Sequence, residues 1–507
     1  MKRLPLWIIV ASGIILSSCA KKMPDFVNSI PDDVVGVATL HPMKLHTKGN
    51  VNSLESMKNK VKDEIWGQII EDPLSTGLAM NEYFYMFVRM EVGTPVIGMV
   101  GGMKDAVKFV STLSRIEEDF SAQIMEAEGY SYMQPDEAGI IAWNDEQLIV
   151  LGAPDGDELG AEYWRSTLDV MFNPIKEESV TSLVDFRDFT GKMKDLNLWM
   201  ASNELMEVLE EISDNTEADI PQLPVTLMNN YARVFVDFAD GEMHITGETH
   251  FSEEVEKNIE EVLVMKPSLN SDMLKLTPGG NLLVALAGSM DMEKLRETVG
   301  KFAPSRIDSV GNRLEAATGI PAEELVIAFT GDFTIAINAL EQETMIPLEL
   351  FVGLGVNSDA IQDKLMESVQ NMAPVEEEGD FFIINIQGNE IYSGIIGDLW
   401  VITNARGYKE AATGSGLDRS LVDSRFNDFA DGSMGMYMNL DLESYPSIVK
   451  GLLEQNPERN EWVTRITEPF DYMGVSASNY ENQILLKTNR PSENSLYTLL
   501  KLSESSD

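Results

Sequence analysis

The chain carries an internal repeat that spans most of its length, and this repeat constrains the fold more than any other feature. The segment STGLAMNEYFYMF (75–87) resembles ATGIPAEELVIAF (317–329), and Thr76 matches Thr318 at an offset of 318 − 76 = 242 residues. Similar segments that recur in the same order indicate that one structural unit occurs more than once.

Further pairs of similar segments follow the same order along the chain, with offsets between 238 and 254 residues. The pairs are 30–43 with 277–290, 98–110 with 352–365, SLVD at 182–185 with 420–423, Asp188-Phe189 with Asp428-Phe429, and 234–246 with 475–487. Colinear matches at a nearly constant offset do not arise by chance. We therefore predict two copies of one domain, residues 30–265 and residues 266–507.

Each copy has the hydrophobic pattern of an α+β fold. An opening strand at 34–40 precedes an amphipathic helix predicted near 51–70. Hairpins follow at 139–152 and 391–403, and Gly397-Asp398 forms a tight-turn pair between two apolar runs. Because strands adjoin strands and helices fall between hairpins, the sequence predicts two tandem similar domains. Each is expected to be mainly antiparallel sheet with helices on one face.

The beginning of the chain has the layout of a secretory signal. Lys2 and Arg3 precede an apolar run at 4–16, and small serine residues follow it. The run is shorter than the ~20 residues that a spanning helix needs. The order Leu-Ser-Ser-Cys at 16–19 resembles a bacterial lipobox. This resemblance implies that the thiol of Cys19 receives a diacylglycerol and that the signal is cut before it. The expected parts are a signal peptide at 1–18 and a lipidated tether at 19–29.

The lipid on Cys19 implies a membrane anchor, because several acyl chains together hold a protein on a bilayer. Cys19 is also the single cysteine of the chain, so we expect no intrachain disulfide. Ala20 and Lys21 follow it in place of an aspartate. By resemblance to lipoprotein sorting, this favours the outer membrane, with the protein facing the periplasm. No later apolar stretch reaches spanning length, so we expect no transmembrane helix.

The formal net charge is −45, from 83 acidic and 38 basic residues. A surface this acidic repels phosphate backbones, so we expect no nucleic-acid partner. The charge also repels anionic lipid head groups, so we expect the folded body to stand off the membrane.

Motifs that carry catalysis or cofactors are absent from the sequence. It has no Gly-x-Ser-x-Gly nucleophile turn and no glycine-rich phosphate loop. The segment 154–160 fails as a calcium loop, because Leu159 stands at a ligand position. The acidic runs 117–119 and 376–378 read as solvated charge. The four histidines also give no ligand set, and a wet strand face explains His244 and His250 better than a metal does; the other two are His41 and His46. We therefore predict no catalytic residue, no cofactor and no metal.

Methionine is abundant, with 28 residues, and it alternates in the segment SMGMYMNL (433–440). Met434, Met436 and Met438 would share one strand face. Thioethers can line an adaptable binding surface or bind copper(I). A strand face packed in the core is the preferred interpretation.

Several segments together resemble a known family. They are the lipobox, IPDDVVGVATLHPMKL (30–45), the TGL…E…F segment that begins at Thr76, and MKDAVKF (103–109). This combination is similar to uncharacterised Bacteroidetes lipoproteins that are grouped as domain of unknown function 4836. The resemblance implies a location in the cell envelope and carries over no active-site residue.

The sequence favours a non-enzymatic, lipid-anchored binding or scaffold protein of the cell envelope. Its partner would be another envelope protein, a lipid or a glycan, bound where the two copies create a cleft or surface. The alternative is a hydrolase of envelope polymers, with a carboxylate site assembled from residues far apart in the sequence. A third hypothesis is a structural spacer with neither cleft nor partner.

Overall fold

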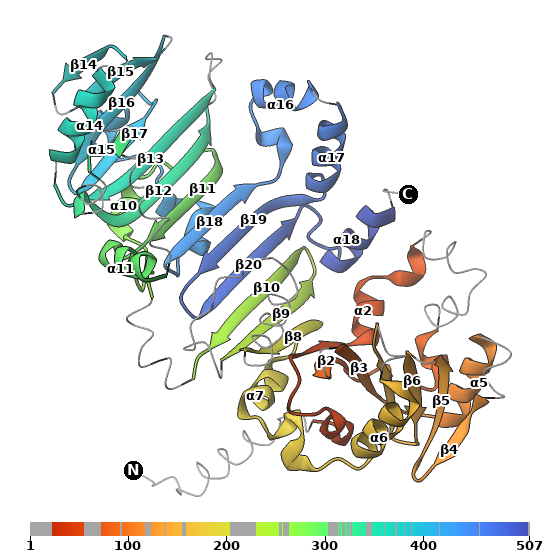
Figure 1. Ribbon diagram of the computed structural model, residues 1–507. Coiled ribbons are helices and arrows are strands. Elements are labelled where there is room, and N and C mark those ends of the chain that lie inside the picture. The colour runs from red at the N-terminus through yellow and green to blue at the C-terminus, as the bar shows by residue number, and fades with distance from the viewer. Residues whose placement is uncertain are drawn as a thin grey trace, which may run out of the picture. The chain divides into compact units, whose positions relative to one another are not determined.

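The structure is a computed structural model of the 507-residue chain (Figure 1). It describes residues 23–504 apart from the gaps 55–71, 92–93, 117–122, 137, 155–158, 203–229, 253–255, 257–262, 303–312, 314, 317–319, 322–323, 325–326, 341–346, 359, 371–372, 380, 387, 415 and 456. The helix predicted near 51–70 therefore lies mostly outside the described residues. In the described part, a short helix at 42–48 follows the opening strand.

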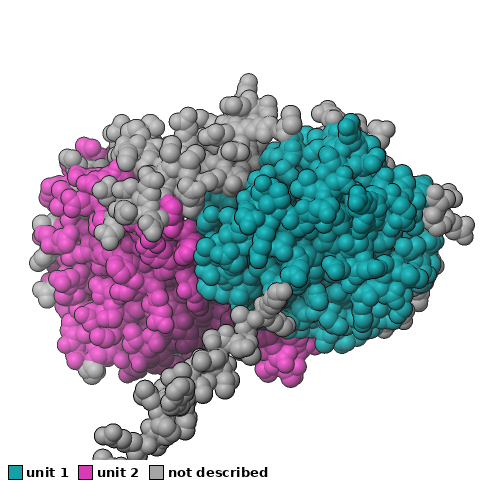
Figure 2. Space-filling model, turned by 90° about the horizontal axis from the view of Figure 1, so that it is seen from below, with its two compact units in different colours: residues 1–237, 507 teal, residues 238–506 magenta. Residues whose placement is uncertain are grey.

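The fold mixes helices with antiparallel strands, so the α+β prediction is confirmed. The chain divides into two compact units, residues 1–237 with 507 and residues 238–506 (Figure 2). Unit 2 includes strand β10 (Glu242–His250), because β10 pairs along most of its length with β20 (Glu481–Thr488).

The strands of unit 1 pair antiparallel in the order β4-β5-β6-β7-β3-β2-β1-β8-β9. The strands are β1 (Gly36–Leu40), β2 (Phe84–Glu91), β3 (Thr94–Gly102), β4 (Met125–Ala127), β5 (Tyr130–Asp136), β6 (Gly139–Trp143), β7 (Gln147–Gly152), β8 (Leu196–Ala201) and β9 (Tyr231–Ala239), which continues past the division. Its α-helices are α2 (Pro42–Lys48), α5 (Ala106–Ile116), α6 (Gly160–Phe172) and α7 (Val184–Lys192), and its 3-10 helices are η1 (Asp25–Ser29), η2 (Val51–Ser53), η3 (Pro73–Thr76), η6 (Lys176–Glu178) and η7 (Val180–Ser182).

The strands of unit 2 also pair antiparallel, in the order β14-β15-β16-β17-β13-β12-β11-β18-β19-β20-β10. The remaining strands are β11 (Leu282–Ser289), β12 (Phe329–Ala339), β13 (Leu348–Val356), β14 (Val375–Glu378), β15 (Phe381–Ile386), β16 (Asn389–Ile396), β17 (Leu399–Thr403), β18 (Met434–Asn439) and β19 (Phe470–Ala477). The α-helices are α10 (Ser271–Leu276), α11 (Met292–Phe302), α14 (Ala360–Gln370), α15 (Tyr408–Thr413), α16 (Ser447–Glu454), α17 (Pro457–Thr467) and α18 (Ser495–Glu504), and the 3-10 helices are η9 (Leu421–Asp423), η10 (Arg425–Phe429) and η11 (Leu442–Ser444).

The order of pairing from β11 to β19 in unit 2 is the order from β1 to β9 in unit 1. Loop contacts match as well. The Val180 N–H donates to the Ile30 carbonyl, and the Leu421 N–H donates to the Thr277 carbonyl, both at 2.9 Å. The pairs 30–43 and 277–290 thus lie in the same structural context in each unit.

The predicted equivalence of SLVD at 182–185 with SLVD at 420–423 is wrong by three residues. Pro31 forms an isolated bridge with Ser179, and Pro278 forms the corresponding bridge with Ser420. Ser420 therefore takes the place of Ser179 and not of Ser182, the first residue of the earlier SLVD. Four identical residues in a connecting segment do not establish which positions of the two units are equivalent. The backbone contacts of the segment decide this.

Both faces of the unit 1 sheet bury apolar residues under helices. In β6, Ile140 packs into a core cluster with Trp164 of α6. Trp143 of the same strand packs into a second cluster with Phe109 of α5. Neighbouring side chains of a strand point to opposite faces, so these two clusters lie on the two sides of the sheet.

Unit 2 repeats this arrangement. Val401 of β17 packs with Tyr408 of α15, whereas the adjacent Trp400 packs in another cluster with Met366 of α14. The prediction that the helices lie on one face is therefore wrong. Strands such as GIIAW (139–143) and LWVIT (399–403) are apolar at successive positions because both of their faces are covered.

The tight turn predicted at Gly397-Asp398 is confirmed. Ile396 of β16 pairs with Leu399 of β17, which leaves two residues in the turn. Gly397 has a φ of 59°, in the left-handed region that glycine adopts without strain. Among the described residues, no helix has the length and apolar character needed to span a bilayer.

Candidate functional site

Two neighbouring cavities in unit 2 form the candidate binding site. The smaller one, about 300 Å³, is named here the charged cavity, and its polar lining includes Arg419, Arg425, Tyr437, Asn439, Asp441 and Asp471. The larger one, about 440 Å³, is named the apolar cavity, and its lining includes Leu282, Leu283, Leu340, Tyr445 and Pro446. Leu282 and Asn439 line both cavities, so the two adjoin at the ends of β11 and β18.

Arg425 contributes a half-exposed cation to the lining of the charged cavity. It opens the 3-10 helix η10, and the buried Phe426 and Phe429 of that helix fix it to the core. The Ser424 hydroxyl caps this helix by accepting the Phe426 N–H at 3.2 Å. The position of Arg425 therefore depends on a short, well-anchored segment.

The guanidinium of Arg425 pairs with a carboxylate of β19. Its Nη1 donates to Oδ1 and Oδ2 of Asp471 at 3.2 and 3.0 Å. The guanidinium carbon also lies 4.9 Å from the centre of the Tyr472 ring, within the range of a cation–π contact. Burial lowers the pKa of Arg425, and the Asp471 carboxylate outweighs this effect, so the pKa lies above its ordinary value.

The other wall of the charged cavity comes from the chain that leaves β18. The side-chain oxygen of Asn439 accepts the Asp441 N–H at 2.9 Å. The Asp441 carboxylate in turn accepts the Glu443 N–H at 3.0 Å and caps η11. The Tyr445 hydroxyl donates to the Asn439 carbonyl at 2.6 Å and so connects this wall to the apolar cavity. These local bonds hold Asn439 and Asp441 in place without a ligand.

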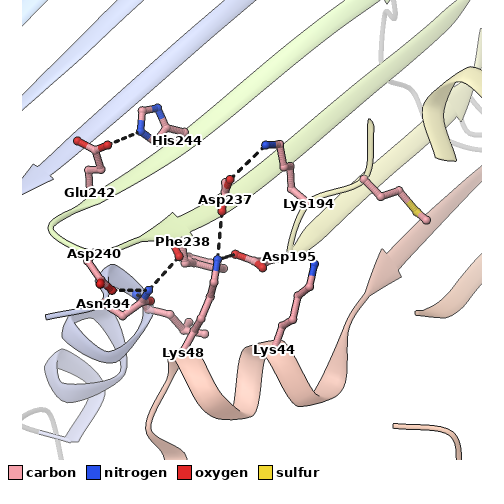
Figure 3. A network of polar contacts seen from close by, with 12 residues as sticks. Lys44, Lys48, Lys194, Asp195, Asp237, Phe238, Asp240, Glu242, His244 and Asn494 are labelled. Atoms are coloured by element: carbon pink, nitrogen blue, oxygen red, sulfur yellow. Dashed lines mark hydrogen bonds and ion pairs between the residues drawn. The ribbon is translucent and has the colours of Figure 1, made fainter. Parts of the chain in front are cut away.

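Lysine and aspartate side chains also form a charged cluster in unit 1 (Figure 3). Lys48 Nζ of α2 lies 2.5 Å from Asp195 Oδ2 and 3.1 Å from Asp237 Oδ1. Lys194 Nζ lies 3.3 Å from the other oxygen of Asp237. Burial raises the pKa of Asp237, but both lysines outweigh it and the pKa lies below its ordinary value. Since these charges neutralise one another, the cluster fastens α2 to the segments around β8 and β9.

His41 belongs to the same part of unit 1 and has a structural role. Its Nδ1 accepts the Lys44 N–H at 3.3 Å and caps α2. Its ring meets the Tyr83 ring edge-on at 5.1 Å between centroids. Burial raises the pKa of the Tyr83 hydroxyl.

The histidine pair on β10 does not form a ligand set. His244 Nε2 lies 3.0 Å from Glu242 Oε1, and the His244 side chain is 48% exposed. The acidic run Glu376 to Glu378 lies on the edge strand β14 and is exposed, as predicted. Asp155, Asp157 and the run 117–119 lie outside the described residues. Across the described ranges, no group of three or more His, Cys, Asp or Glu side chains could hold a metal ion.

The three methionines of β18 lie on one strand face that is only partly buried. Met434, Met436 and Met438 are each half-buried, while the buried Tyr437 between them faces the core cluster. Met436 pairs with Val475 of β19, and Met438 pairs with Met473 of the same strand. The interpretation as a core face therefore holds only in part, because these methionines are half-buried and do not belong to the buried core clusters.

Cys19 and the rest of the predicted signal lie outside the described residues. Sequence reasoning did not find the two cavities. Their lining comes from segments as far apart as 280–283, 339–340, 419–446 and 471, and no short motif links them. The weak signal was Arg419 and Arg425, two cations six residues apart in a strongly acidic chain.

Comparison with solved structures gives only a remote likeness. Two structures of TP0453, in crystal forms III and I, match at 11% sequence identity and a TM-score of 0.27. The match covers 49% of this chain and 91% and 90% of those chains. A TM-score this low supports no argument about fold or function. Comparison with curated proteins gives no match.

A family comparison is conclusive over nearly the whole chain. Residues 26–496 match the profile described as domain of unknown function DUF4836. The matched range covers both units and both cavities. The chain therefore belongs to the DUF4836 family.

Proposed function

We propose that this protein is a non-enzymatic binding protein, tethered by lipid to the cell envelope, with its ligand site in the two cavities of unit 2. The observation that carries the proposal is their adjacency at Leu282 and Asn439. Ligand sites typically combine apolar walls with a small number of placed polar groups, and here the apolar cavity supplies the former and the charged cavity the latter. In the charged cavity, Asp471 is held by Arg425 at 3.0 Å, an arrangement that suits recognition better than proton transfer.

The proposal includes two copies of one domain, residues 30–265 and 266–507. The repeated strand order and the matching loop bonds at Ile30 and Thr277 support it. Membership of a lipoprotein family of Bacteroidetes, with an outer-membrane location facing the periplasm, is proposed on the lipobox and the residues that follow it.

The tether is tested by replacing the sulfur that would carry the lipid. In Cys19→Ser, the hydroxyl cannot form the thioether, so the protein should move from the membrane pellet to the soluble fraction on cell fractionation. Ser18→Ala is the matched control and should stay in the pellet, because alanine is also a small residue before the cleavage point. If Cys19→Ser stays in the pellet, the lipid anchor is refuted.

The ligand site is tested by photo-crosslinking in intact envelopes. A photoreactive amino acid at Leu340, which lines the apolar cavity and is 39% exposed, should capture a specific envelope component. The same amino acid at Val107, 81% exposed in α5 of unit 1, is the control and should not capture it. Equal capture at both positions, or none at Leu340, would contradict a ligand site in unit 2.

A hydrolase of envelope polymers is the second candidate, because the charged cavity presents the carboxylates of Asp441 and Asp471. It requires that Asp441→Asn abolish turnover of an envelope polymer by the purified protein. Turnover that depends on Asp441 would place this candidate above the binding protein.

A further inference from the structure

The balance of charge in the charged cavity identifies the class of ligand that fits it. The lining of the charged cavity includes two cations, Arg419 and Arg425, and two carboxylates, Asp441 and Asp471, so the formal charges of these four side chains cancel. Asp471 already accepts two bonds from Arg425, and an incoming anion would have to displace it. The net charge of −45 also repels anions. A neutral ligand does not compete with Asp471 for Arg425 and is not repelled by the net negative charge.

The hydrogen-bond donors and acceptors that line the charged cavity are suited to bind the hydroxyl groups of a ligand. A hydroxyl donates one hydrogen bond and accepts two, so it pairs best where donors and acceptors stand side by side. A guanidinium has five N–H donors, more than the two oxygens of Asp471 use, and a carboxylate has about four acceptor positions. Arg419 adds donors to the same wall, and its Nη2 makes one long bond, 3.5 Å, to the Asp423 carbonyl.

Two polar groups of this cavity, Arg425 and Asp441, already have partners that restrain them before any ligand arrives. Arg425 is held from one side by Asp471 and from another by the ring of Tyr472. Asp441 is held by the Glu443 N–H. Fixed donors and acceptors lose little side-chain entropy on binding, which favours a ligand with its own fixed pattern of hydroxyls.

We propose that the charged cavity binds the neutral sugar end of a glycan and that the apolar cavity takes the apolar group joined to that sugar. The shared residues Leu282 and Asn439 bring the two parts of such a ligand together. This inference rests on the proposed ligand site in unit 2 and adds the chemical class of the ligand.

The test uses soluble probes that keep one apolar group and change the head. A set of 4-nitrophenyl glycosides (glucoside, galactoside, mannoside and N-acetylglucosaminide) provides neutral sugars. Their controls are 4-nitrophenyl phosphate, which is anionic, and 4-nitrobenzylamine, which is cationic. Binding to the full mature chain is measured by isothermal titration calorimetry. At least one glycoside should bind, and about tenfold or more tighter than either charged probe.

Arg425→Ala should weaken glycoside binding about tenfold or more, because it removes hydrogen bonds between the sugar and a charged group, which are stronger than those between neutral groups. Arg490→Ala is the matched control, since Arg490 also pairs with one acid in unit 2, Glu493 at 3.3 Å, and does not line either cavity. Asp441→Asn provides a second variant and should also weaken binding if Arg425→Ala disturbs the fold, which circular dichroism would detect.

Three outcomes would overturn the inference. If the phosphate or the amine binds more tightly than every glycoside, the cavity is an ion site. If no probe binds although Leu340 captures an envelope component, the ligand site stands and its class is different. If a glycoside binds and Arg425→Ala and Asp441→Asn leave its affinity unchanged, the sugar lies elsewhere. Failure of the capture at Leu340 itself would refute the proposed function instead. Release of coloured nitrophenolate would reveal hydrolysis in the same samples.

Discussion

The clearest lesson at the scale of single residues comes from a buried ion pair in unit 1. The Arg233 guanidinium pairs with the Asp185 carboxylate, and their side chains are only 4% and 7% exposed. The indole N–H of Trp199 donates to the same carboxylate at 2.8 Å. Buried charges persist only when partners satisfy them, and here Asp185 accepts from two different side chains.

Removing Asp185 should therefore be costly. Asp185→Ala leaves the Arg233 guanidinium buried without its carboxylate, and we expect a loss of about 3–5 kcal/mol in the free energy of unfolding, measured by urea titration. The control Asp272→Ala removes an exposed ion pair with Lys275 and should leave the urea midpoint unchanged, since exposed pairs contribute little. A small effect of Asp185→Ala would mean that water reaches Arg233.

At the scale of elements, Gly77 of the TGL segment binds, through its backbone, the residues that precede helix α5. Gly77 has a φ of 86°. Its carbonyl accepts the N–H groups of Lys104 and Asp105, both at 2.9 Å, just before α5 begins. A Cβ atom at this position would lie 2.4 Å from the Asp105 carbonyl oxygen. Glycine is therefore required both by backbone conformation and by close packing.

Gly77→Ala should destabilise unit 1 by at least about 1–3 kcal/mol, because alanine is strained at positive φ and would push the start of α5 away. Thermal unfolding followed by circular dichroism measures the effect. Gly191→Ala in α7 is the control, since no atom outside the nearby backbone of its own helix and its two chain neighbours lies within 4 Å of the added Cβ. Alanine there should be neutral or stabilise the helix by up to about 1 kcal/mol. Equal melting temperatures for the two variants would contradict this explanation.

At the scale of the whole molecule, the dominant physical property is acidity. A net charge of −45 makes the folded chain repel itself, while the ion pairs described above neutralise only a few of its acids. Raising the salt concentration from about 20 mM to about 150 mM shortens the Debye length to about 8 Å and should raise the melting temperature.

Sodium chloride and choline chloride at equal ionic strength distinguish screening from specific binding. Screening depends on ionic strength alone, so both salts should raise the melting temperature equally, as measured by scanning calorimetry. A rise with sodium only would indicate a bound cation. An unchanged or falling melting temperature in both salts would contradict the role of self-repulsion.

The sequence predicted the features that depend on local pattern. Alternating apolar runs joined by turn residues specify antiparallel hairpins, and Gly397 forms the predicted turn. The helices on both faces were not predicted, although Ile140 and Trp143 in one short strand were a signal of two covered faces. The wrong register of SLVD has a similar origin, because backbone bonds at Pro31 and Pro278 decide which serine is equivalent.

By itself, the sequence determined the α+β class, the antiparallel pairing and the acidity. The spacing of apolar residues, the residues that form turns and the number of charges can all be read from residues that are close in the sequence. Only the tertiary structure decided the site. The cavities form where β11, β18, β19 and the segment before η10 come together, and Arg425 meets Asp471 across 46 positions of sequence. No local sequence pattern predicts this contact between Arg425 and Asp471, because it depends on which strands pair and on where the core places the ends of those strands.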